Sequence, residues 1–208
     1  MTARLEIEIA SDVICPWCYI GKRRFEKALA LLGDEVEANV TWLPFQLNPG
    51  MPVEGVARVD YRRSKFGSLE RGRVLDARVS QEGAQEGIEF AFDRMQRTPN
   101  TLAAHRLIDL AQAQERADAV VMALFSAYFE AALDIGDAEV LAALAGRCGV
   151  SGWPEAADAA RVARLEESVR ELGISGVPTF IFDRKSALSG AYPPEQLAAA
   201  IRQSLGSE

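Results

Sequence analysis

Histidine, cysteine and long apolar runs are scarce in this sequence, and their scarcity excludes several classes of protein. Its 208 residues include one histidine and three cysteines. Three cysteines argue against a framework of disulfide bonds and leave redox, metal or buried roles for these side chains. No stretch approaches the roughly 20 uncharged apolar residues that a membrane-spanning helix needs, so we expect no membrane partner.

Positive charge is also in short supply. The chain has 23 Lys and Arg against 30 Asp and Glu, and the resulting net charge of −7 argues against a nucleic-acid partner. The exception is residues 58–78, where seven basic residues accompany three acidic ones. Such a segment is typical of a solvated helix face; alternatively, it forms a collar that attracts an acidic partner or a small anion.

The first residues lack the pattern of a secretory signal. In place of a charged start and an apolar run, Leu5, Ile7 and Ile9 alternate with polar residues, as in a half-buried strand. We therefore expect a cytoplasmic location.

Strand patterns are concentrated at the two ends of the chain. The expected elements there are a strand at 5–9, a helix from Pro16 to Gly33, a strand at 37–43, a hairpin of residues 178–182 and 187–190, and a helix that begins at Pro193–Glu195. Because strands need sheet neighbours, the two ends should meet in one sheet. We predict an α/β protein whose thioredoxin-like domain comprises residues 1–50 and 174–208.

The middle of the chain has a different, alanine-rich pattern. Apolar residues recur there at helical spacing in four stretches, at 102–111, 120–129, 140–145 and 162–172. Strand patterns nearly vanish. We therefore predict that residues 51–173 form an all-helical insertion domain.

The motif Cys15-Pro16-Trp17-Cys18 lies where the first strand gives way to the first helix. The unpaired amides and the positive end of the helix dipole stabilise a thiolate at Cys15, which makes it a nucleophile. Cys18 lies one turn further on the same helix face and can attack a mixed disulfide formed on Cys15. The pattern thus predicts redox chemistry.

Two other interpretations of the cysteine pair are weaker. A zinc site needs about four ligands, and only Cys148 and His105 are left to complete one, so we expect no metal. A coincidental pair of core cysteines does not explain Pro16 and Trp17 at a strand–helix junction. Cys148 is interpreted as a buried or half-buried thiol. His105 lies between apolar helix positions and is interpreted as a structural histidine with its hydrogen bonds satisfied or, alternatively, as a neighbour of the active site.

Four segments together resemble the DsbA-like oxidoreductases, and within them the FrnE-like branch, which is related to 2-hydroxychromene-2-carboxylate isomerase and to kappa-class glutathione transferase. They are S-D-V-I-C-P-W-C-Y-I-G-K at 11–22, W-L-P-F-Q-L-N-P at 42–49, P-N-T-L-A-A-H-R at 99–106 and G-V-P-T-F at 176–180. The resemblance spans nearly the whole chain. It implies a thioredoxin fold with a helical insertion.

The resemblance also implies roles for individual residues. Cys15 would be the attacking thiol and Cys18 the resolving one, with Pro178 in the cis form beside Cys15. Val177 would offer backbone hydrogen bonds to a substrate and, with Pro16 and Trp17, would bind it. The chain departs from this branch at 190–192, where Gly-Ala-Tyr replaces the usual Gly-Ala-Gln, and in lacking a second, C-terminal cysteine pair.

The leading functional hypothesis is a cytoplasmic thiol–disulfide oxidoreductase that acts on disulfide- or thiol-containing proteins or small molecules. It needs no bound cofactor, although glutathione could serve as co-substrate. One alternative is a glutathione-dependent isomerase or transferase, in whose relatives a serine usually replaces the reactive cysteine. Another is a non-catalytic substrate-binding or chaperone module. An alanine-rich helix face could support a homodimer.

Overall fold

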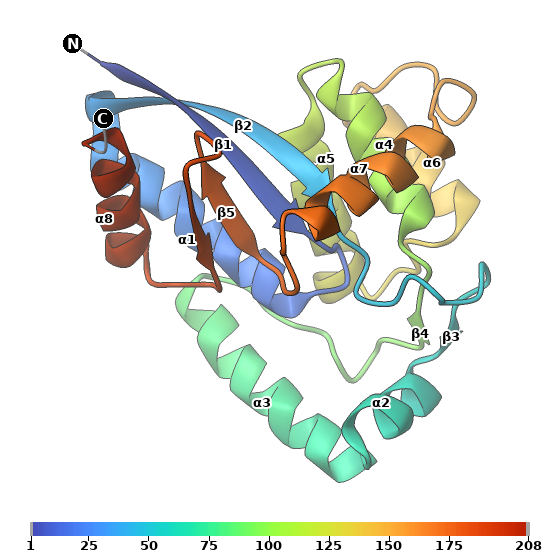
Figure 1. Ribbon diagram of the computed structural model, residues 1–208. Coiled ribbons are helices and arrows are strands. Elements are labelled where there is room, and N and C mark those ends of the chain that lie inside the picture. The colour runs from blue at the N-terminus through green and yellow to red at the C-terminus, as the bar shows by residue number, and fades with distance from the viewer. Residues whose placement is uncertain (1, 207–208) are drawn as a thin grey trace.

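The computed structural model describes residues 2–206, which form a central sheet with helices around it (Figure 1). The elements, in chain order, are β1 (Ala3–Ser11), α1 (Pro16–Leu32), η1 (Gly33–Glu35), β2 (Val36–Pro44), β3 (Val56–Ala57), α2 (Arg58–Phe66), α3 (Leu69–Gln85), β4 (Arg97–Thr98), α4 (Leu102–Gln112), α5 (Ala117–Phe125), η2 (Ser126–Glu130), α6 (Ala138–Arg147), α7 (Ala159–Glu171), β5 (Thr179–Phe182), β6 (Ser186–Ser189) and α8 (Pro194–Leu205).

The main sheet joins the two ends of the chain, as the sequence predicts. Its strand order is β2-β1-β5-β6, with β1 parallel to β2 and antiparallel to β5. The β1–β5 register places Ile7 opposite Phe182 and Ile9 opposite Phe180. These side chains are buried, so the apolar alternation of β1 continues across the strand pair into one core. The α/β class with a thioredoxin-like sheet is confirmed.

Two groups of helices cover this sheet. Helix α1 crosses between β1 and β2 and packs against α8, and the rings of Phe25 and Phe180 lie 5.5 Å apart beneath them. Helices α4, α5 and α7 of the insertion pack against β2. In Figure 1, α8 and the α4–α7 group lie at opposite ends of the sheet, and α2 and α3 extend away from it. None of the helices within residues 2–206 is both long and apolar enough to cross a membrane.

The insertion is helical, with two local features that the sequence pattern does not show. A two-residue antiparallel pair, β3 with β4, joins the start of α2 to the start of α4. Two residues are too few for any periodic pattern. The helix expected over residues 120–129 also changes type, because its last turn, Ser126–Glu130, is a π-helix. The apolar spacing of α- and π-turns differs by about one residue per turn, so a short stretch cannot distinguish them.

A buried ion cluster fastens α1 to the end of α3. The guanidinium group of Arg24 donates to Glu86 and Glu82, and also to the carbonyl oxygen of Ala191, each at 2.7 Å. Lys27 donates to the second oxygen of Glu86 at 2.7 Å. Burial alone would raise the pKa of Glu86, but the hydrogen bonds from Lys27 and Arg24 outweigh it and lower that pKa. One guanidinium thus holds three separate segments together.

We expect the substitution Arg24→Met to lower the free energy of unfolding by about 3 kcal/mol, because the buried carboxylate of Glu86 then keeps only Lys27 as its cation and Glu82 loses its ion pair with Arg24. Urea unfolding would measure the change. The control is Arg4→Met, which removes the exposed ion pair of Arg4 with Glu37 at 3.1 Å and should change the same free energy by less than about 1 kcal/mol. Equal losses in the two variants would contradict the assignment.

Candidate redox site at the start of helix α1

Cys15 is the residue that begins helix α1. Its backbone is extended, and Pro16 follows at the first helical position. The amide of Cys15 donates to the carbonyl of Asp12 at 3.0 Å, and its own carbonyl accepts from Cys18 at 3.0 Å and Tyr19 at 3.3 Å. These bonds fix the first turn, so the Cys15 side chain is held at the positive end of the helix dipole.

The Val177–Pro178 loop lies against Cys15, although the two are 162 positions apart in the chain. The Val177–Pro178 peptide bond is cis, which confirms the expectation from the resemblance. The Cys15 thiol donates to the carbonyl oxygen of Val177 at 3.8 Å. Thr179 Oγ1 donates to Gly176 O at 2.8 Å and so fixes the loop just after the proline. The structure therefore brings Cys15, Val177 and Pro178 together.

Cys18 lies one turn into α1 and is only 2% exposed. Burial raises the pKa of its thiol well above the usual range, and its hydrogen bond and charge interaction with Cys15 raise it further. The Asp12 amide and the Ser11 hydroxyl act in the opposite direction, but more weakly. Cys18 is therefore a neutral thiol near neutral pH, held in contact with Cys15. Both cysteines are free in the structure.

Gly21 is a residue of the site that sequence reasoning missed. A Cβ atom at this position would lie 2.9 Å from Cγ of Pro178 and 3.6 Å from Cβ of Ala191. Only glycine lets α1 approach the proline loop this closely. The sequence does contain a signal for this contact, because a glycine inside a strong helix pattern is unfavourable unless close packing requires it.

Pro16 and Trp17 are half-buried beside the thiols. Pro16 borders a hollow of about 50 Å³ that contains Arg58 and Arg62 from α2. A larger groove of about 570 Å³ shares both arginines and adds Arg73 from α3. The basic segment expected from the sequence therefore borders the site. Its charge is partly neutralised, because Asp76 pairs with Arg58 at 3.0 Å and with Arg62 at 2.7 Å.

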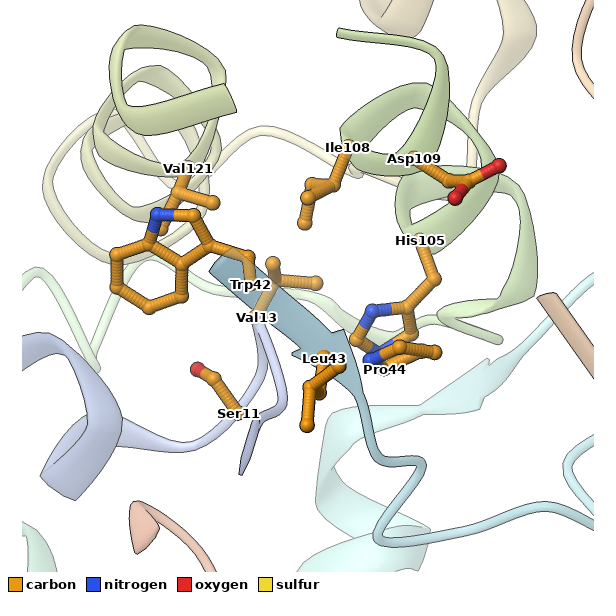
Figure 2. Close-up of a pocket in the computed structure, with 9 residues that line it drawn as sticks. All are labelled: Ser11, Val13, Trp42, Leu43, Pro44, His105, Ile108, Asp109 and Val121. Carbon is orange, nitrogen blue, oxygen red and sulfur yellow. The ribbon is translucent and has the colours of Figure 1, made fainter. Parts of the chain in front are cut away.

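On its other side the site adjoins a small, partly open cavity of about 10 Å³ (Figure 2). Ser11 lines it from β1, Trp42 from β2 and His105 from α4. His105 is buried, but its Nε2 atom makes no hydrogen bond to protein. His105 lies next to the redox motif, as the alternative interpretation expects, because its Nε2 atom is 3.4 Å from Oδ1 of Asp12, whose carbonyl accepts from the amide of Cys15. The imidazole lies there because α4 packs on β2 directly behind the redox motif.

Cys148, the third cysteine, ends α6 in the insertion and is half-buried, as expected. Burial raises the pKa of its thiol, and the positive charge of Arg147 opposes this effect. Within residues 2–206, the structure contains no group of three or more His, Cys, Asp or Glu side chains that could hold a metal ion.

The close approach of α1 to the proline loop can be tested with Gly21→Ala. We expect the free energy of unfolding to fall by about 1–3 kcal/mol, because the added methyl group overlaps Pro178. The matched control is Gly146→Ala in α6, where a Cβ atom meets nothing within 4 Å and alanine should stabilise the helix by about 0.5–1 kcal/mol. Urea unfolding of both variants measures the difference, and a stabilising Gly21→Ala would contradict the packing argument.

Comparison with known proteins places this geometry in context. The DSBA-like thioredoxin domain family matches residues 6–202. The uncharacterized protein YwbO of Bacillus subtilis is 28% identical over 185 residues, which cover 85% of this chain and 86% of YwbO.

Solved structures are similar over nearly the whole chain. A probable DsbA oxidoreductase from Streptomyces coelicolor is 31% identical, with a TM-score of 0.89 over 98% of this chain and 91% of that one. The cytosolic disulfide reductase DsbM from Pseudomonas aeruginosa, crystallised with GSH, is 21% identical, with a TM-score of 0.68 over 97% of this chain and 100% of that one.

Proposed function

We propose that this chain, which belongs to the family of DSBA-like thioredoxin domains, is a cytoplasmic thiol–disulfide oxidoreductase whose reacting groups are Cys15 and Cys18. One observation carries the proposal. The Cys15 thiol, at the start of α1, lies 3.8 Å from the carbonyl oxygen of Val177 beside cis-Pro178, with the buried Cys18 thiol in contact behind it.

The chemistry follows from the unequal surroundings of the two thiols. The Cys15 thiolate attacks a substrate disulfide, forms a mixed disulfide and releases the first substrate thiolate. Cys18 then loses its proton and attacks the Cys15 sulfur, which forms the Cys15–Cys18 disulfide and releases the second substrate thiolate. The substrate gains the two electrons that the cysteine pair loses. The same steps in reverse introduce a disulfide into a dithiol substrate.

The surfaces around Cys15 suit an extended thiol or disulfide substrate. Val177 presents its backbone next to the reacting sulfur, and Pro16 and Trp17 provide an apolar border. Arg58 and Arg62 share a single carboxylate, Asp76, so the groove beside Pro16 keeps positive charge. This charge favours a carboxylate on the substrate, as in glutathione or in an acidic segment of a protein.

Replacement of the two cysteines by serine tests the proposal. We expect Cys15→Ser to abolish disulfide reduction of insulin, because no nucleophile remains, and Cys18→Ser to accumulate a mixed disulfide on Cys15 that mass spectrometry detects. Cys148→Ser is the matched control and should keep full turnover, because Cys148 ends α6, outside the motif. Full turnover by Cys15→Ser would overturn the proposal.

The same variants distinguish the two alternatives. A glutathione-dependent isomerase or transferase would retain its activity with serine at position 15, since the hydroxyl can hold the glutathione sulfur. A binding or chaperone module would suppress aggregation of an unfolded protein equally well in wild type and in Cys15→Ser. An oxidoreductase loses its activity in that variant.

A further inference from the structure

In the second step of the proposed reaction, the Cys18 thiol must give up its proton. Cys18 is buried and neutral, so it cannot attack the Cys15 sulfur until its proton has left. Bulk water does not reach a side chain that is 2% exposed. A group within the core must therefore accept the proton. The inference that follows rests on the proposed function and identifies this group.

Ser11 lies between Cys18 and the small cavity shown in Figure 2. Its hydroxyl faces the Cys18 thiol and favours the thiolate form. The same hydroxyl makes no hydrogen bond of good geometry to any other protein atom, and Ser11 lines the 10 Å³ cavity behind it. This volume is about the minimum that one water molecule occupies. A hydroxyl and one water can pass a proton from the sulfur to the opposite wall of the cavity.

The opposite wall carries His105, which faces Asp12. Nε2 of His105 and Oδ1 of Asp12 lie 3.4 Å apart, and neither atom makes a hydrogen bond to any other protein group. Both side chains are buried, at 3% and 0% exposed. The other carboxylate oxygen of Asp12 accepts from the amide of Leu47 at 2.7 Å, so the carboxylate is held in place while Oδ1 is free to accept.

Simple packing does not account for this cluster. A buried polar atom without a partner destabilises a protein, and four such atoms lie in or beside the cavity wall, on Ser11, Asp12, Trp42 and His105. Apolar side chains would fill the same space without that loss. Groups of this kind persist in a core where the reaction uses them.

We propose that the Asp12–His105 pair accepts the Cys18 proton, through the Ser11 hydroxyl and one water in the cavity, when Cys18 attacks the mixed disulfide. The S–H bond of Cys18 breaks, the Cys18–Cys15 bond forms and the bond between Cys15 and the substrate sulfur breaks. The proton rests on the Asp12–His105 pair, and the substrate leaves as a thiolate. In the reverse direction the pair returns the proton to Cys18.

The other titratable groups around the cavity are already engaged. Asp109 lines it from α4 but pairs with Arg161 at 2.9 Å. Lys22 of α1 lies 5.8 Å from the ring of Trp42 and pairs with Glu26 and Asp118.

Two more groups face the region from its edges. Tyr128 of the π-turn interacts with the charge of Asp12, and burial raises the pKa of this phenol, so it stays neutral. Glu166 of α7 is bound to Gln46 and Arg170. Within residues 2–206, Asp12 is the buried carboxylate with an unpartnered oxygen.

The test uses the reduced full-length chain and dithiobis-nitrobenzoate, which releases one coloured thiolate when Cys15 attacks and a second when Cys18 resolves the mixed disulfide. The variants are Asp12→Asn, which keeps an acceptor for the Leu47 amide, and His105→Gln. In both we expect an unchanged first phase and a second phase slowed by about 10²-fold, the usual contribution of general base catalysis. The rate of this slowed second phase should rise about tenfold per pH unit, because hydroxide then removes the Cys18 proton.

Ile108→Val is the matched control, since Ile108 lines the same cavity one turn after His105 and carries no polar atom. It should leave both phases unchanged. A second phase that stays fast in Asp12→Asn and His105→Gln overturns the inference and leaves the oxidoreductase proposal standing. An equal slowing in Ile108→Val assigns the effect to packing and also overturns it. If wild type releases no first thiolate, the proposed function itself fails, and the inference fails with it.

Discussion

The pairing of β1 with β5 is the interaction on which the rest of the structure depends. It joins residues from the two ends of the chain in an antiparallel register that places Ala10 opposite Thr179. Cys15 follows the end of β1, and Pro178 immediately precedes β5, so this register alone brings the proline loop to the start of α1. A shift by one residue would turn every side chain of β5 to the other face and remove the Val177 carbonyl from Cys15.

The two thiols of the motif differ in their surroundings. Cys15 is at the helix start, where the backbone is still extended, whereas Cys18 lies in the first turn of α1 and faces the core. The same packing that buries β1 therefore keeps Cys18 neutral. The two thiols therefore have different surroundings because the motif spans the boundary between loop and helix.

The sequence predicts those parts of the site that short-range patterns describe. Cys15 and Cys18 are identified by their spacing and by the strand–helix junction around them, and Pro178 by its place before an apolar strand. Gly21 is not, because its reason lies in a loop that reaches it only after folding. The surroundings of His105 are not predicted for the same reason: an apolar helix face marks it as buried, but Asp12, which lies 3.4 Å from its Nε2 atom, belongs to a distant part of the sequence. Such contacts between distant segments leave no periodic signal.

The insertion also contributes to the surroundings of the two cysteines. Its helix α4 supplies one wall of the cavity behind Cys18, and the Arg24 cluster fixes its α3 end to α1. The Arg24 cluster acts on α1, the helix that begins after Cys15 and contains Cys18, whereas α4 packs against β2. Any motion of α3 relative to the sheet would therefore alter the surroundings of Cys18, because α3 is tied to α1, the helix that contains this thiol. In the reaction proposed above, the resolving step at Cys18 is the step that such a motion would affect.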